Sequence, residues 1–380
     1  MSALGRIVEG FSTLREPDDT IRTAFGGGTT ASGQTVSIRN SLGLIPVHSA
    51  VSQISTAIGS LPLNVYRRLD NGDRERARSH RAWSMLHDFP NPEMAADEVW
   101  EIVTVHLNLW GNAFIWKRRD SLGVVREIWP LSPSRFQVHR KKGKRLFIVD
   151  GKLEEPVTET DILHIRGLSL DGIVGLSPIQ EAREALGVMK AQGDFQGRFL
   201  QGGGKPGVLL KHPSRLSDDA ATRLERSFDA TTPGSAKLLE EGMTAEKWTM
   251  PLEDAQFIES MQFSDLRVAQ LFNLPPRRLG AKSGDSLTYA TTESEGRDYV
   301  TYTLRRWMGR IENSIRRDQS IFTQGDRFFC EFNADALMRG DTKNRYEAHE
   351  IGLRAKFLLP SEVRQMENLP QVDLPPSAGE

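Results

Sequence analysis

Apolar residues recur at three- and four-residue intervals in five long stretches of the chain, a spacing that predicts amphipathic helices. We expect these helices over residues 47–61, 94–110, 177–201, 254–273 and 292–317. Glycine or proline stands at the end of the first four stretches. Both residue types end helices, since glycine favours other backbone conformations and proline lacks an amide donor. Two shorter helices are expected after Asp341 and from Ser361.

Short apolar or alternating segments between these helices predict β-strands. They cover residues 63–66, 113–117, 124–129, 135–139, 145–149, 161–166, 208–210, 236–240, 246–250 and 327–333. Asn71-Gly72 is typical of a hairpin turn, and strands 236–240 and 246–250 are expected to pair around Gly242.

The predicted helix over residues 177–201 opens favourably, with a capping hydroxyl from Ser177 and proline at the first helical position. Three glycines interrupt its interior, at Gly187, Gly193 and Gly197. Each costs up to about 1 kcal/mol relative to alanine in a helix. This cost indicates close packing against a neighbouring segment, or a bend.

Two segments stand between predicted helices and are candidates for functional regions. Pro275 and Pro276 end the helix 254–273, and a polar loop of roughly 15 residues follows before the next helix; loops of that length tend to be functional or disordered. Residues 202–252 form a small unit inserted between two helices. Such an insertion is expected to project from the far ends of those helices.

Residues 1–40 are expected to form a peripheral, flexible arm. The run GGGTTASG within it has the composition of a flexible linker. A disordered arm and a partner-binding arm both fit this composition.

Composition and charge narrow the possibilities. A length of 380 residues fits two or three compact units. The net charge of −1 gives no overall attraction to nucleic acid or to an anionic membrane. The one cysteine, Cys330, cannot form an intramolecular disulfide and fits a reducing compartment. No apolar run reaches about 18 residues, so no membrane span is expected.

Motifs that would indicate catalysis or cofactor binding are incomplete. The segment GGGKPG lacks the serine or threonine that must follow the lysine of a Walker loop. The segment GLSP departs from the Gly-x-Ser-x-Gly elbow of hydrolases. The histidines have no second ligand at a spacing typical of zinc sites. We therefore expect no enzyme activity, no cofactor and no metal site.

The run RKKGKR over residues 140–145 is the strongest basic cluster of the chain. Clustered lysine and arginine can neutralise phosphates. The run also lies between two predicted strands, where a solvated hairpin tip would have the same composition. Both interpretations remain open at this point.

Four segments carry a family resemblance through their order and spacing. They are GLSP at the start of a long helix, DAQFIESMQFSDLRVAQLFNLPPRRLG, TYTLRRWMGRIENSI and EFNADALMRGDTKNRYEAHEIGLRAKFLLPSEVRQMENLPQV. Together they resemble the portal (head-to-tail connector) proteins of tailed bacteriophages, in the compact siphophage-type family. The resemblance covers about residues 46–372. Members of this family also occur in prophages and in phage-derived gene transfer particles.

The resemblance implies a fold of the α+β class, the portal fold, with an α/β wing, a two-helix stem, a small α/β clip, a long wing helix and a short helical crown. Its regions would be a flexible N-terminal arm (1–40), wing (41–175), stem helix (176–201), clip (202–252), stem helix (253–273), tunnel loop (274–290), wing helix and strand (291–340), crown (341–370) and flexible tail (371–380).

The resemblance also implies a function. Twelve subunits would form a ring at a unique capsid vertex, and double-stranded DNA would pass through it during packaging and ejection. The ring would dock the terminase large subunit, then head–tail adaptor or neck proteins, and contact the major capsid protein. It would reside in the virion after assembly in the host cytoplasm, without any membrane contact.

Two groups of side chains are candidate sites by this resemblance. The tunnel-loop group that would face DNA consists of Arg277, Arg278, Lys282, Ser283, Asp285 and Thr288. The clip group that would face protein partners consists of Asp218, Asp219, Arg223 and Arg226. Arg277 and Arg278 could instead cap the preceding helix.

Two other function classes compete with a conduit. A packaging-associated nucleic-acid-binding scaffold without a channel would use the basic run 140–145. A nuclease or phosphotransferase of the packaging pathway would need carboxylate, histidine or phosphate-loop constellations, which the sequence lacks.

Overall fold

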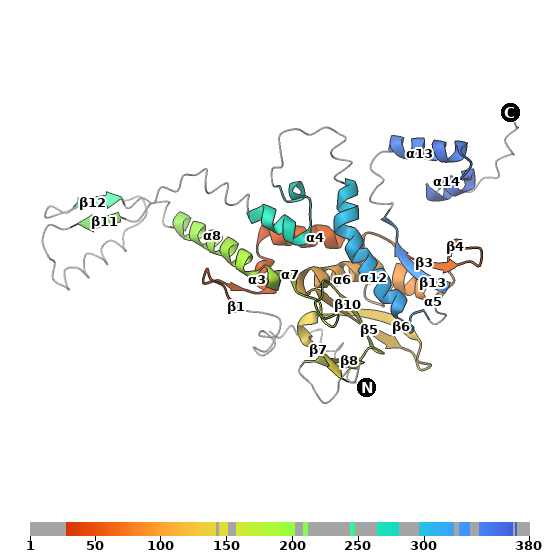
Figure 1. The fold of residues 1–380 in the computed structure, drawn as a ribbon, viewed down its shortest axis with the longest axis horizontal. Helices are drawn as coiled ribbons and strands as arrows, with labels where there is room; N and C mark the ends of the chain where they lie inside the picture. The colour runs from red at the N-terminus through yellow and green to blue at the C-terminus, as the bar shows by residue number, and fades with distance from the viewer. Residues whose placement is uncertain are drawn as a thin grey trace.

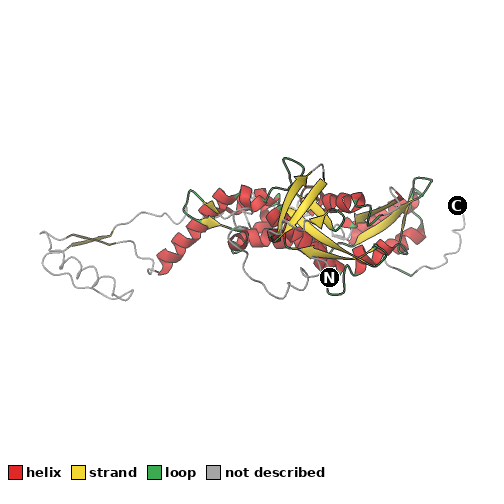
Figure 2. Cartoon of the chain, turned by 90° about the horizontal axis from the view of Figure 1, so that it is seen from below, coloured by secondary structure: helices red, strands yellow, loops and turns green. Residues whose placement is uncertain are grey.

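The computed structural model describes residues 28–141, 144–150, 157–201, 208–211, 244–247, 264–280, 296–322, 327–334, 342–367 and 369–370. These residues form an elongated body of helices and antiparallel sheets, which confirms the α+β class (Figures 1 and 2). The helix α8 (Arg183–Gln201) projects from this body on the side of the paired strands β11 (Val208–Lys211) and β12 (Thr244–Lys247) (Figure 1). The other end carries α13 (Thr342–Arg354) and α14 (Pro360–Met366) (Figure 1).

A three-stranded antiparallel sheet with the order β10-β5-β6 forms the centre of the body. Its strands are β5 (Asn112–Arg119), β6 (Val125–Leu131) and β10 (Ile162–Arg166). Successive side chains of a strand point to opposite faces. Phe114 and Trp116 of β5 therefore join one buried cluster, and Ala113 and Ile115 join another.

These two clusters put different layers on the two faces of the central sheet. The first cluster is shared with the sheet of β7 (Phe136–Lys141), β8 (Lys144–Val149) and β9 (Val157–Thr158). The second is shared with the helices α6 (Ala96–Trp110) and α12 (Arg305–Arg317). The central sheet is therefore covered by strands on one face and by helices on the other.

A second sheet, of order β13-β3-β4, joins distant parts of the chain. The strand β3 (Leu63–Arg68) pairs with β4 (Arg74–Arg76) through a turn in which Gly72 has a φ of 90°, which confirms the predicted hairpin. It also pairs with β13 (Phe328–Phe332), placing Val65 opposite Cys330. Burial raises the pKa of the Cys330 thiol, and the side chain packs as a small apolar residue.

Glycines allow α6 to pack closely at both ends. The helix α4 (Ile45–Gly59) lies against α6, and a Cβ on Gly59 would come within 2.8 Å of the Asp97 carbonyl oxygen. At the other end, Gly111 has a φ of 68° and ends α6 as predicted. A Cβ on Gly111 would lie 1.9 Å from the Leu176 carbonyl oxygen, so only glycine fits there.

The expectation of a flexible arm over residues 1–40 is wrong for its last third. Residues 28–40 form the strands β1 (Gly28–Thr29) and β2 (Thr35–Val36) and the start of α3 (Ile38–Ser41), and Val36 is buried in the main core. This segment lies on α8, where the backbone amide of Ala31 donates to Glu184 at 3.0 Å and Lys190 donates to Gln34 at 2.9 Å. Linker-like composition did not reveal these contacts, because they depend on a helix about 150 residues away. Residues 1–27 lie outside the described residues.

The predicted helix 177–201 is two helices. Ser177 caps α7 (Pro178–Glu181) as expected, the backbone departs from helical geometry at Ala182, and α8 follows. Gly187 marks the close packing that the sequence indicated, since a Cβ there would come within 2.5 Å of the Thr30 hydroxyl. Gly193 and Gly197 have nothing within 4 Å of such an atom, so packing does not require them.

Two further expectations are met only in part by the described residues. The strand β12 pairs with β11, while the predicted strand 236–240 and Gly242 lie outside the described residues. The long helix over 292–317 is described from residue 296, and its first part includes a π-helical segment, η5 (Tyr299–Leu304), before α12 begins.

The remaining elements are short. They are the helices α5 (Arg81–Trp83), η2 (Ser84–Asp88), η3 (Pro133–Arg135) and η4 (Pro276–Leu279), and a helical segment over residues 264–272. Among the described helices, none is long and apolar enough to cross a bilayer.

Candidate functional site

The helical segment 264–272 ends as its sequence predicts, just before two prolines. Asn273 takes a left-handed conformation with a φ of 56°, and the Leu274 amide bonds back to the Ala269 carbonyl at 2.8 Å. Pro275 and Pro276 follow, and Pro276 opens η4. The chain therefore turns sharply at the start of the predicted tunnel loop.

This turn is fastened to the helix that follows the loop. The Asn273 side-chain amide donates to the Tyr302 carbonyl at 2.7 Å, and the Asn273 carbonyl accepts the hydroxyl of Thr303. Arg306 of α12 donates to the Phe272 carbonyl at 3.2 Å. A cationic cap on the helix 264–272 thus comes from α12 across the loop.

Arg278 occupies a defined position at the base of the loop. Its guanidinium lies 3.8 Å from the centroid of the Tyr299 ring, within the range of a cation–π interaction. The Tyr299 hydroxyl donates to the Gln53 carbonyl at 3.0 Å, and the Gln53 side chain donates to the Arg278 carbonyl at 2.9 Å. Burial raises the pKa of Tyr299 to about 12, so the phenol remains a neutral donor.

These contacts join α4 to both ends of the segment 281–295. That segment lies outside the described residues and contains four of the six predicted loop residues, Lys282, Ser283, Asp285 and Thr288. Arg277 is half-buried in η4 and Arg278 is exposed. The structure therefore defines how the loop is anchored, and no pattern in the sequence indicated the contacts that Gln53 and Tyr299 make there.

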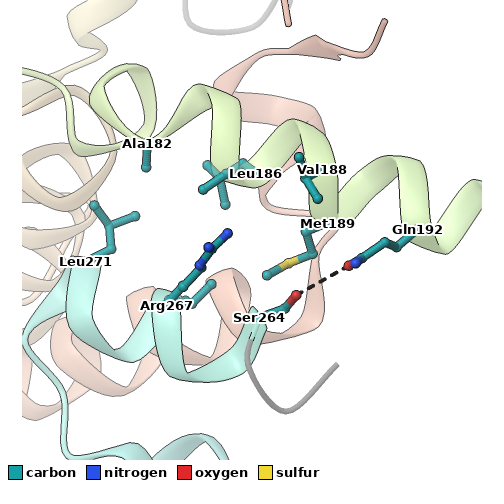
Figure 3. A pocket seen from close by; sticks show the side chains of 10 residues that line it. Ala182, Leu186, Val188, Met189, Gln192, Ser264, Arg267 and Leu271 are labelled. Atoms are coloured by element: carbon teal, nitrogen blue, oxygen red, sulfur yellow. Dashed lines mark hydrogen bonds between the residues drawn. The ribbon is translucent and has the colours of Figure 1, made fainter. Parts of the chain in front are cut away.

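A second feature is the packing of α8 against the segment 264–272, the two helices predicted as the stem. They enclose a small cavity of about 60 Å³ lined mainly by apolar side chains, among them Leu186 and Met189 of α8 and Leu271 of the facing segment (Figure 3). The Ser264 hydroxyl donates to Gln192 at 3.3 Å at its outer end (Figure 3). On α8, Val188 and Phe195 remain 43% and 46% exposed, so an apolar part of this helix is accessible in the single chain.

The predicted clip group lies outside the described residues, since Asp218, Asp219, Arg223 and Arg226 fall within 212–243.

The basic run 140–145 lies on the β7–β8 hairpin, where Arg140 is opposite Arg145 and Lys141 is opposite Lys144. Arg145 is not at a solvated tip, because its guanidinium is paired with Glu159. The tip itself, residues 142–143, is not among the described residues.

The described side chains do not assemble a metal-binding constellation. No group of three histidine, cysteine, aspartate or glutamate side chains gathers at ligand distance among them. His164, the most buried histidine of the central sheet, shares its Nε2 proton with the Asn112 side-chain oxygen at 2.9 Å. Both elements that hold this pair, β10 and β5, belong to the body of the fold.

Comparison with known proteins places this geometry in a family. A portal protein of Streptomyces phage phiC31, described as probable, is 29% identical over 376 residues, covering 93% of this chain and 80% of the relative. The crystal structure of an HK97-family phage portal protein from Corynebacterium diphtheriae is similar in fold, with a TM-score of 0.63 at 15% identity over 80% of this chain and 98% of that one.

A chain in the neck of a native gene transfer agent particle, computed with C12 symmetry, is similar with a TM-score of 0.57 at 20% identity. It is matched over 99% of its length and 93% of this chain. The family model described as phage portal protein matches residues 46–368. The central sheet, α6, α12 and both ends of the anchored loop lie within that match, and the chain belongs to the phage portal protein family.

Proposed function

We propose that the chain assembles into a ring of twelve subunits at a unique capsid vertex and serves as the conduit for double-stranded DNA. The observation that carries this proposal is the anchorage of the loop 281–295, whose two ends are held by Arg278, Tyr299 and Gln53. A loop that touches moving DNA needs a rigid base, because each contact transmits force to the body. The C12 symmetry of the similar gene transfer agent neck supports the number of subunits.

The regions have distinct roles in this proposal. The wing is the double-sheet body with α12, the stem is α8 with the segment 264–272, the clip contains β11 and β12, and the crown contains α13 and α14. The exposed apolar residues of α8 fit a stem, because a ring needs a heterologous interface between side-by-side copies.

The partners and location follow from the same role. The clip docks the terminase large subunit during packaging and head–tail adaptor or neck proteins afterwards, and the wing contacts the major capsid protein. The protein acts without catalysis, is assembled in the host cytoplasm and is retained in the virion. A nucleic-acid-binding scaffold without a channel is the alternative, and the pairing of Arg145 with Glu159 weakens it by withdrawing one cation from the basic run.

Mass measurement combined with negative-stain imaging tests the conduit directly. We expect rings of about twelve subunits with a central opening, as closed rotational symmetry requires. A monomer that persists across a wide range of salt and protein concentrations would favour the scaffold instead.

Deletion of residues 281–288 tests the loop assignment. We expect the ring to assemble and DNA packaging or retention to fail, because the anchoring residues 278 and 299 are preserved. Loss of folding would place the loop in the core and contradict its role in the channel. Substitution of Asp218, Asp219, Arg223 and Arg226 should weaken terminase or adaptor docking while the ring remains intact.

A further inference from the structure

A polar pocket of about 410 Å³ lies along the outer edge of β10, away from the loop and the stem. It is lined by side chains from β5, β8, β10 and the end of α12, together with the turns at residues 159–160 and 318–320. Five of the lining residues are cationic and two are acidic: Lys117, Arg119, Arg145, Arg166 and Arg317, with Glu159 and Asp318.

Both carboxylates of the pocket are already paired with cations. Asp318 accepts the Lys117 ammonium at 2.5 Å, and its other oxygen accepts the Ser320 amide at 2.9 Å. Glu159 accepts the Nε proton of Arg145. Three cations, Arg119, Arg166 and Arg317, therefore have no carboxylate partner within the described part of the chain.

These uncompensated cations are close enough to repel one another. The pKa of the Arg166 guanidinium is lowered by burial and by the neighbouring charges of Arg145, Arg317 and Arg310, while Glu159 offsets part of this effect. Arg119 bonds only carbonyl oxygens, those of Gly123 at 2.8 Å and Thr160 at 2.6 Å. Its Nε and the Nη1 of Arg145 are buried donors without an acceptor among the described residues. An anion in the pocket would accept from these donors and offset the repulsion between the cations, since a buried donor without an acceptor is costly.

His164 adds to the same pocket a hydrogen-bond acceptor that needs a donor. The residue is 6% exposed, and its Nε2 donates to the Asn112 side-chain oxygen, which is fixed because the Asn112 amide group donates to the Gly175 carbonyl at 2.7 Å. Burial and the charges of Arg145 and Arg166 lower the pKa of His164 well below its usual range, so the ring is neutral. Its Nδ1 is therefore a bare acceptor, buried without a partner among the described residues.

We propose that this pocket binds inorganic hydrogen phosphate, whose oxyanions are held by Arg166 and Arg317 and whose P–OH donates to Nδ1 of His164. Guanidinium forks match phosphate oxygens in pairs. The three uncompensated charges exceed what a single carboxylate would neutralise. A phosphodiester carries no hydroxyl hydrogen, and neither does sulfate at neutral pH, so neither can satisfy His164.

Calorimetric titration of the assembled full-length protein at constant ionic strength tests the proposal. We expect saturable binding of inorganic phosphate, and binding of sulfate weaker by about tenfold, the ratio that corresponds to one neutral hydrogen bond. A short duplex with a 5′-phosphate should bind no better than the same duplex without one, because a phosphate monoester is mostly the dianion at neutral pH and lacks the P–OH. Equal affinity for phosphate and sulfate would overturn the role of His164, and the absence of saturable phosphate binding would overturn the site.

Matched variants locate the site. The pair R166Q/R317Q should weaken phosphate binding by about tenfold or more, since two charge-assisted contacts are lost. The pair R305Q/R316Q removes the same charge from α12 outside the pocket and should leave the affinity within about twofold. Should the first pair fail to fold, R317Q alone changes an exposed residue in the last turn of α12 and keeps the test open. Unchanged affinity in the pocket variants would contradict the proposal.

The same titration of a variant at Glu154 and Glu155, which lie outside the described residues, gives one further test. If the wild type does not bind phosphate but E154Q/E155Q does, the chain fills the pocket with its own carboxylates and the proposal is wrong.

Discussion

The guanidinium of Arg278 lies 3.8 Å from the centre of the Tyr299 ring, and these two residues flank the loop assigned to the channel. The Gln53 side chain of α4 donates a hydrogen bond to the Arg278 carbonyl, and the Gln53 carbonyl accepts one from the Tyr299 hydroxyl. Residues from three separate parts of the chain thus fix the width of the loop base.

Loss of the Arg278 side chain should loosen this base. We expect R278Q to lower the free energy of unfolding by about 1 kcal/mol, the usual size of a partly exposed cation–π contact. Limited proteolysis should then cut within residues 281–295 faster than in the wild type. The control Y299F keeps the ring under the guanidinium and removes only the bond to Gln53, so it should protect the loop better than R278Q. Identical cleavage rates in the wild type and R278Q would show that the contact does not hold the loop.

The packing of Thr30 on Gly187 predicts opposite effects for two glycines of one helix. We expect G187A to destabilise the protein by about 1–3 kcal/mol, because the new methyl group would overlap the Thr30 side chain. Thr30 cannot easily yield, since its hydroxyl donates to the Gln34 carbonyl at 2.9 Å. G193A meets no atom within 4 Å and should be stabilising by up to about 1 kcal/mol. Chemical denaturation compares the two; equal effects would mean that residues 28–36 do not rest on α8 in solution.

The ion pair of Lys117 and Asp318 joins the central sheet to the end of α12. The Lys117 side chain is 1% exposed, so K117M would leave Asp318 without its main counter-charge in a mostly buried position. We expect a loss of about 3–5 kcal/mol in unfolding free energy. The double variant K117M/D318N should recover a large part of it, because the uncompensated carboxylate is then gone. A double variant no more stable than K117M would indicate that the lysine acts through packing alone.

His106 predicts a pH dependence of stability. Burial lowers its pKa from 6.5 to about 4, and its Nδ1 is buried without a partner among the described residues. A folded-state pKa below the unfolded value means that the stabilisation is complete above pH 6.5 and is lost as the pH falls from 6.5 towards 4. The loss between pH 7 and pH 5 should reach about 2 kcal/mol at most, and less because the His106 side chain is only half-buried.

The variant H106F isolates this contribution. Phenylalanine keeps an aromatic ring at the edge-on contact with Trp110, whose centroid lies 5.6 Å away, but it cannot take up a proton. Unfolding measured between pH 7 and pH 5 should therefore change less with pH in H106F than in the wild type. Parallel curves for the two proteins would assign the pH dependence to other groups.

The periodicity of apolar residues was sufficient for most elements of the body. The end of α6 and the start of β5 followed from Gly111, because glycine tolerates both the left-handed conformation and the close approach of Leu176. The portal resemblance likewise rested on the order of sequence segments, and the family match covers nearly the same residues. Local patterns succeed here because helix and strand periods report directly which face is buried.

Long-range contacts were beyond these patterns. The hairpin of residues 28–36 has the composition of a linker but packs on α8, and β12 pairs with β11, more than 30 residues earlier in the chain. Nothing in the sequence connects Lys117 and Arg317 with Arg145 of the basic run 140–145. The fold brings the three cations to one pocket, where their proximity makes their charges interact.

The sequence by itself determined the class of fold, the positions of the main helices and strands, and membership of the portal family, because all three depend on residue order and spacing. The tertiary structure alone decided which distant residues share an environment. The fold brings Arg278 into contact with Tyr299, so that the two residues anchor the ends of one loop. It also gathers arginines from separate elements around His164, in a pocket that offers both hydrogen-bond donors and an acceptor. Charge interactions depend on distance and desolvation, and neither quantity is written in the order of the residues.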